Sequence, residues 1–212
     1  MKVLAINGSP KKDGNTAYAI EVVCSQLRSA GIETEVFQVG NKDVRGCTAC
    51  GQCLQRRDGK CVLPGETVNE GLALMAAADG IVLGAPVYFS GIPGTLKSFL
   101  DRTFRVAGAN GSLFRHKVGV SVVADRRAGG VPVFNQLNNY LHYAEMFMAN
   151  SNYWNVIFGA LPGEAAQDRE GTQSMRILGR NMAWLLRAVE VAKAQFPLPE
   201  PEPKEMTNFI RP

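Results

Sequence analysis

Four of the five cysteines lie within fifteen residues of one another. Cys47, Cys50, Cys53 and Cys61 form the pattern CxxCxxCx7C. Thiolates at this spacing on a tight loop can converge on one metal centre, whereas disulfides between such close neighbours would be strained. A compact CxxCxxC core is typical of iron–sulfur ligation, and because the chain has no second set, Cys61 is the natural fourth ligand. The spacing favours a cluster, while a zinc site and a metal-free loop of reduced thiols remain alternatives.

The segment GSPKKDGNT, residues 8–16, is a second candidate for chemistry. It follows an apolar run and precedes a helical pattern, so its backbone N–H groups and the helix dipole favour an anion. Ser9, Asn15 and Thr16 can donate to phosphate oxygens, and Lys11 adds positive charge nearby. The segment matches neither the P-loop nor the dinucleotide fingerprint, so a single phosphate group is the better fit. The alternative is a turn with a capped helix.

A third group of residues follows another apolar run, in the segment GAPVYFSGIPG. Its prolines and glycines restrict the backbone, and its aromatic side chains offer a surface for a flat heterocycle. A turn with two packed aromatics is the alternative. The candidate binding residues in this segment are Pro86, Val87, Tyr88, Phe89 and Gly91.

The segment ADRRAGG follows the next apolar run and carries Asp125, Arg126 and Gly129. Such a loop can close over the same ligand, and a cation there would favour an anionic reduced ring. The alternative is a solvated, charged turn.

The positions of these loops depend on the elements around them. Strands are predicted at residues 2–6, 32–39, 81–85, 117–124 and 153–158, and helices at 66–78, 94–104, 133–147 and 167–194, with one more ending at Gly31. Strands that alternate with helices indicate one doubly wound parallel sheet with helices on both faces. Ligands bind such sheets at the carboxyl ends of the strands, where all three loops begin. The fifth cysteine, Cys24, falls at an apolar position of the first helix and is predicted to be buried and inert.

Composition limits the class of protein. The chain has 212 residues, 46% hydrophobic and 20% charged, with a net charge of +4. We find no secretory signal and no apolar run long enough to cross a membrane, so we expect a cytoplasmic protein with reduced thiols. The modest positive charge suits anionic small molecules or an acidic partner protein, and no basic block points to nucleic acid.

We predict one doubly wound domain over residues 1–196, with a cysteine-rich insertion at residues 46–63, and an extended tail over residues 197–212. The tail is proline-rich, so it should run extended. Phe209 and Ile210 near its end can dock on a neighbouring subunit, with a disordered tail as the alternative.

Taken together, these segments resemble the iron–sulfur flavoproteins of the flavodoxin-like NAD(P)H-dependent FMN reductase family. The matching pieces are GSPKKDGNT, the cysteine run, APVYFSGIPGTLKSFLDR and the closing TNFIR. The resemblance implies a five-stranded sheet of order 2-1-3-4-5. It also implies that the FMN phosphate lies on residues 9–16, with the isoalloxazine against residues 86–91 and the loop of residues 125–130 completing the site. Relatives assemble as dimers or tetramers and pass electrons between FMN and a [4Fe–4S] cluster.

Three functions are consistent with this pattern. The first is an FMN and iron–sulfur oxidoreductase supplied by NAD(P)H or a ferredoxin-type donor and acting on a small-molecule acceptor. The second is an FMN-only NAD(P)H-dependent reductase with a structural, zinc-bound or vestigial cysteine loop. The third is a flavodoxin-like carrier. In each case the chemistry lies on the cofactors, and no side chain is needed as a nucleophile. We expect the cluster on the flavin edge of the sheet, and structural roles for His116 and His142.

Overall fold

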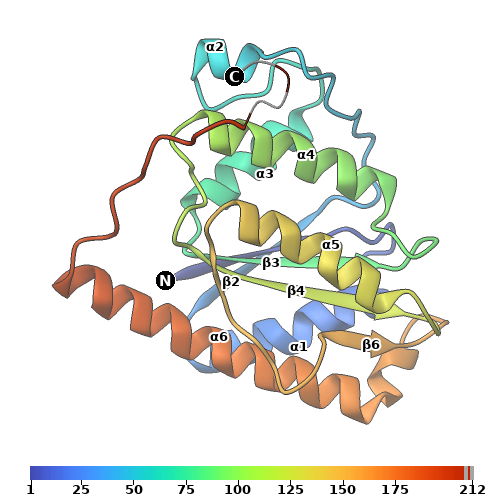
Figure 1. Cartoon of the computed structure of the whole chain (residues 1–212). Helices are drawn as coiled ribbons and strands as arrows, with labels where there is room; N and C mark the ends of the chain where they lie inside the picture. Colours follow the sequence, from blue (N-terminus) through green and yellow to red (C-terminus); the bar gives the residue numbers. More distant parts are fainter. Residues whose placement is uncertain (208–209, 211–212) are drawn as a thin grey trace.

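Continuous apolar runs form the centre of a parallel sheet. The computed structural model describes residues 1–207 and 210 (Figure 1). Strands β1 (Lys2–Asn7), β3 (Gly80–Pro86) and β4 (Val118–Asp125) are almost wholly buried, whereas β2 (Glu33–Gln38) lies at an edge and has no fully buried residue. All pairings are parallel and the order is β2-β1-β3-β4-β5, which confirms the predicted flavodoxin-like topology.

The fifth position of the sheet is shared by two short strands. β5 (Phe147–Met148) pairs with the start of β4 and β6 (Val156–Phe158) with its end, where a single strand at residues 153–158 was predicted. Between them the edge of β4 is covered by a side chain, because Asn155 Nδ2 donates to the Ser121 carbonyl oxygen at 2.9 Å. This amide satisfies a buried backbone acceptor that a continuous strand would otherwise pair.

Helices cover both faces of the sheet (Figure 1). On one face, α1 (Asn15–Ser29) and α6 (Arg169–Gln195) pack together against the sheet. The opposite layer consists of α3 (Glu66–Ala77), α4 (Gly94–Ala109) and α5 (Gly130–Tyr143). Each layer buries its own apolar cluster, as expected for a doubly wound sheet.

Several helix boundaries differ from the prediction. The largest difference is in α4, which runs to Ala109 where the helix was predicted to end at residue 104. The helix predicted at residues 133–147 ends at Tyr143, because Glu145 takes a left-handed φ of 53° and the chain turns into β5. A short 3₁₀ helix, η1 (Glu164–Gln167), precedes α6, whose start is capped by the Asp168 carboxylate accepting from Gly171 N at 2.9 Å.

The segment after α6 runs extended along the surface (Figure 1). It contacts its own subunit, because Arg115 Nη1 donates to the Pro199 carbonyl oxygen at 2.9 Å and the Lys204 ammonium lies 4.8 Å from the Tyr143 ring centroid. Phe209 lies outside the described residues, so docking on a neighbouring subunit stays a prediction. Within the described residues, no helix is long and apolar enough to cross a membrane.

His116 links the fold to pH. Its ring stacks on Phe147 with centroids 5.2 Å apart, and burial together with the neighbouring Arg115 and Lys193 lowers its pKa, while Glu145 opposes the shift. The unfolded chain, in which the histidine has its ordinary pKa near 6.5, is therefore protonated at a higher pH than the folded chain.

We expect the free energy of unfolding to fall between that pH and the lower pKa of the folded state, by about 1.4 kcal/mol for each unit of pKa difference. Denaturant titrations at several pH values in this range should show that the free energy of unfolding depends less steeply on pH in His116→Asn, because asparagine does not titrate. Asparagine also tolerates the left-handed φ of 62° at this position, so the variant should fold. Equal slopes for the two proteins would contradict the assignment.

Candidate functional site

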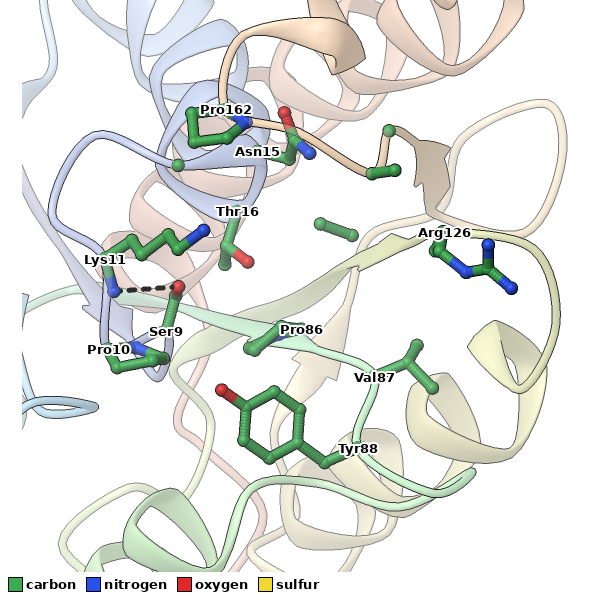
Figure 2. A pocket seen from close by; sticks show the side chains of 14 residues that line it. Ser9, Pro10, Lys11, Asn15, Thr16, Pro86, Val87, Tyr88, Arg126 and Pro162 are labelled. Carbon is green, nitrogen blue, oxygen red and sulfur yellow. Dashed lines mark hydrogen bonds between the residues drawn. The ribbon is translucent and has the colours of Figure 1, made fainter.

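A cavity of about 200 Å³ opens where β1, β3, β4 and β6 end (Figure 2). Among the described residues that line it, the only charged side chains are those of Lys11 and Arg126. A cavity with two cations and no lining carboxylate favours an anionic ligand. The residues that line it are Ser9, Pro10, Lys11, Gly14, Asn15, Thr16, Pro86, Val87, Tyr88, Ala124, Arg126, Gly159, Ala160 and Pro162.

The first loop of the cavity is held by polar side chains from the two neighbouring strands. Asn7 Oδ1 accepts from Ser9 N at 3.0 Å, and Gln38 Nε2 donates to the Ser9 carbonyl oxygen at 2.6 Å. Asn7 Nδ2 in turn donates to Gln38 Oε1 at 2.9 Å. The chain after β2 passes so close that a Cβ on Gly40 would lie 2.2 Å from the Ser9 carbonyl carbon. The loop is therefore positioned before any ligand binds.

Helix α1 begins at this cavity. Its cap residue is Gly14, and within the described residues neither a capping side chain nor an acidic residue serves its first turn. The first N–H groups of a helix need an acceptor, so this end is suited to an anion. Figure 2 shows Ser9, Lys11, Asn15 and Thr16 gathered on one side of the cavity. These are the residues that the sequence predicted for a phosphate.

The aromatic segment forms a tight turn at the opposite side of the cavity. Tyr88 and Gly91 exchange two backbone hydrogen bonds of 3.0 and 2.9 Å, with Phe89 and Ser90 at φ values of 49° and 58°. Two consecutive left-handed residues define a type I′ turn, and non-glycine residues hold that conformation only under constraint. Tyr88 lines the cavity with Pro86 and Val87, whereas Phe89 is fully exposed at the tip and neither it nor Gly91 is a lining residue.

The loop after β4 contributes one of its three predicted residues to the cavity wall. Arg126 lines the cavity, whereas Asp125 is only 4% exposed and braces the loop from inside. Its two oxygens accept from Arg127 N at 3.0 Å and Gly130 N at 2.8 Å. Gly129, at a φ of 100°, caps the start of α5. Asp125 and Gly129 thus do not line this cavity, and both line a separate cavity of about 460 Å³.

A fourth loop, after β6, was missed by sequence reasoning. Gly159, Ala160 and Pro162 complete the wall of the cavity. Glu164 holds this loop, because its Oε2 accepts from Ala160 N at 2.7 Å and Leu161 N at 2.8 Å, and these bonds lower the pKa of its carboxyl group. The signal was present as a proline–glycine turn after the last predicted strand.

The four clustered cysteines line a second, smaller cavity. Cys47 and Cys50 are exposed, and Cys53 and Cys61 are half-buried. The loop contains a short helix, α2 (Gln52–Arg56), which lies beside α4 (Figure 1). The loop bends sharply, with left-handed φ values at Ala49 and Gly51 among others. The predicted quartet is thus brought to one place in the fold.

Arg102 closes the inner side of this cavity. It projects from α4, is 1% exposed, and donates from Nε to Cys61 Sγ at 3.3 Å. Asn69 holds the same cysteine through its backbone, accepting from Cys61 N at 2.8 Å and donating to the Cys61 carbonyl oxygen at 3.0 Å. Sequence reasoning missed both residues, because neither belongs to the cysteine motif and the contacts arise only when α3 and α4 pack against the loop.

The four cysteines line one cavity, but their described side chains do not meet at a single point. Within residues 1–207 and 210, no three His, Cys, Asp or Glu side chains come together closely enough to hold a single ion. Tetrahedral zinc needs four ligands about 2.3 Å from one point, whereas each thiolate of a four-iron cluster binds a different iron atom. Cys24 takes no part, because it is fully buried in α1 and burial raises its pKa to about 11.

The two cavities share no described lining residue. They are joined by α4, which begins just after the aromatic turn and presents Arg102 about 12 Å further along its axis. The cysteine loop leaves the sheet at the expected edge, after β2, but its helix α2 lies over α4 in the helical layer (Figure 1). The packing of α2 on α4 therefore places the cysteine loop away from the strand ends.

The sheet order and the cavity at its carboxyl edge define a flavodoxin-like protein. Residues 1–160 match the sequence model of the NADPH-dependent FMN reductase family, and the chain belongs to this family. It is accordingly an FMN-dependent oxidoreductase.

Two relatives are similar over nearly their whole length. An iron–sulfur flavoprotein of Methanocaldococcus jannaschii is 33% identical over 199 residues, covering 90% of this chain and 100% of the relative. One from Methanosarcina thermophila is 30% identical over 193 residues, covering 90% and 97%. The crystal structure of RosB with a bound 8-demethyl-8-formylriboflavin-5′-phosphate intermediate has a TM-score of 0.69 at 17% identity, covering 100% of this chain and 94% of that one. This last likeness supports the fold.

Proposed function

We propose that this protein is an FMN-dependent oxidoreductase that passes electrons between FMN and a [4Fe–4S] cluster held by Cys47, Cys50, Cys53 and Cys61. The observation that carries the proposal is the cysteine cavity, which is lined by all four cysteines and by Arg102, whose buried guanidinium donates to Cys61 Sγ. The curated relatives named iron–sulfur flavoproteins support it.

The first cavity is the proposed FMN site. The phosphate would lie at the start of α1, where Ser9 and Thr16 present hydroxyl groups and Lys11 supplies charge. The isoalloxazine would lie toward Pro86, Val87 and Tyr88, with Arg126 on the far side from Lys11 (Figure 2). The phosphorylated riboflavin derivative bound in RosB is a ligand of the same chemical class.

The residues of each cavity would bind and orient rather than react. FMN exchanges electrons in pairs with a nicotinamide and singly with a metal cluster, so one protein can connect a two-electron partner to a one-electron partner. Arg126 would place positive charge beside a ring that becomes anionic on reduction. NADPH is the proposed donor because the family is described by that activity. A ferredoxin-type protein is the alternative donor. The proposal also includes a small-molecule acceptor and assembly as a homodimer or homotetramer.

Anaerobic purification, followed by iron, acid-labile sulfide and flavin assays and an absorption spectrum, tests the proposal. We expect about four irons and four sulfides for each FMN, as the composition of the cluster requires. Flavin bands without iron or sulfide would reject the cluster, and zinc in place of iron would assign a structural site to the cysteine loop.

A second candidate is an FMN-only NADPH-dependent reductase. The exposure of Cys47 and Cys50 favours it, because thiols that face solvent need no metal to satisfy them and the loop can remain metal-free. Steady-state oxidation of NADPH by the metal-free protein separates the two candidates. Full turnover with both one-electron and two-electron acceptors would favour the FMN-only reductase.

A further inference from the structure

Arg102 has an unusual environment for a charged residue. It is 1% exposed and is the largest fully buried side chain of the described structure. A buried charge costs several kcal/mol unless opposite charge or well-placed dipoles compensate it. Within residues 1–207 and 210, however, no carboxylate forms an ion pair with it.

The partners of the guanidinium are backbone carbonyl groups and one sulfur. Nη1 donates to the Arg45 carbonyl oxygen at 3.1 Å, and Nη2 donates to the Leu63 and Pro64 carbonyl oxygens at 2.8 and 3.5 Å. Nε donates to Cys61 Sγ at 3.3 Å. Carbonyl dipoles offset part of the charge, but among these partners only the sulfur can carry a full negative charge.

The same carbonyl groups belong to the chain on either side of the cysteine run, before Cys47 and after Cys61. Arg102 therefore ties both ends of the run to α4 and directs one N–H at a cysteine sulfur. This arrangement is directional, because the guanidinium is planar and its donors have a fixed geometry.

From these contacts we infer that Arg102 is a positioning residue that supplies the resident counter-charge of the cysteine centre and raises its reduction potential. This inference rests on the proposed cluster. A centre that gains one electron gains one negative charge, so a buried cation next to a ligand sulfur stabilises the reduced form. A hydrogen bond to a ligand sulfur acts in the same direction.

The chain offers a matched control. Arg105 lies one turn further along α4 and lines the same cavity, but it is exposed. Its charge is screened by water, so removing it should change the centre far less than removing the charge of Arg102. Arg102→Gln and Arg105→Gln remove equal charge, whereas Arg102→Lys keeps the charge and loses the planar fork.

The experiment is a spectroelectrochemical titration of the anaerobically purified protein and these three variants. We expect the midpoint potential to become clearly more negative in Arg102→Gln, to shift less in Arg102→Lys and to change little in Arg105→Gln. Loss of the cluster from Arg102→Gln with retention in Arg102→Lys would also support the inference. Equal potentials in Arg102→Gln and Arg105→Gln would overturn it and leave the proposed function standing.

A measurement on the unsubstituted protein covers the case in which both Arg102 variants fail to fold or load. With isotopically labelled arginine nitrogen, pulsed electron paramagnetic resonance of the reduced centre should detect coupling to an arginine nitrogen. Absence of that coupling would overturn the inference. Absence of iron and sulfide from the unsubstituted protein would be seen before any variant is made, and would reject the proposed cluster and this inference together.

Discussion

Asn15→Asp should weaken FMN binding by roughly a hundredfold to a thousandfold. The side chain lies at the first position of α1 and lines the cavity, so the change places a carboxylate where the phosphate is proposed to bind. Two like charges 4 Å apart cost about 4 kcal/mol at the effective dielectric constant near a protein surface, and each 1.4 kcal/mol is about tenfold in affinity. Fluorescence titration of the flavin-free protein with FMN measures the effect.

The same change should leave the fold intact. Oδ1 of this side chain accepts from Ala165 N at 3.2 Å, and an aspartate keeps that acceptor. A carboxylate at a helix start also interacts favourably with the dipole, by about 0.3–1 kcal/mol. Asn139→Asp, on the exposed face of α5, is the matched control for net charge. Unchanged FMN affinity in Asn15→Asp, with thermal unfolding at the same temperature, would place the phosphate elsewhere.

Cys50→Ser should lower the iron and sulfide content more than about tenfold and leave FMN in place. Loss of an outer-shell partner alone costs 10–100-fold in metal affinity, so loss of a ligand should cost at least as much. The fold should tolerate the change because the Cys50 side chain is exposed. Metal analysis and the flavin spectrum of the anaerobically purified variant give both numbers.

In the Cys50→Ser variant, activity with two-electron acceptors and activity with one-electron acceptors should respond differently. Oxidation of NADPH with a two-electron acceptor should continue, while reduction of a one-electron acceptor should slow, because the cysteine cavity and the cavity proposed for FMN share no described lining residue. Cys24→Ala is the matched control, since this cysteine is buried in α1 away from both cavities. If Cys50→Ser kept the full iron content, or Cys24→Ala lost it, the assignment of the ligands would be wrong.

The sheet was predictable because its central strands are buried on both faces. Residues 81–85 are a continuous apolar run, and residues 118–124 contain one polar side chain, Ser121, so both segments suit burial on two sides. The divided fifth position was not predictable, because β5 and β6 have only two and three residues and depend on Asn155 filling the edge between them. Such short strands carry too little hydrophobic pattern to be recognised.

Sequence and tertiary structure thus contributed different parts of the two cavities. The meeting of the loops that follow β1, β3 and β4 was predictable from the sequence, because parallel strands end at one edge and the residues after them must meet there. The cysteine quartet was also recognisable as a candidate ligand set, because the spacing of candidate ligands is a local property of the sequence. Three contacts became visible only in the folded chain: Asp125 braces its loop, the loop after β6 closes the first cavity, and Arg102 donates to Cys61. Each of these contacts joins residues brought together by packing or by a turn whose direction the local pattern leaves open.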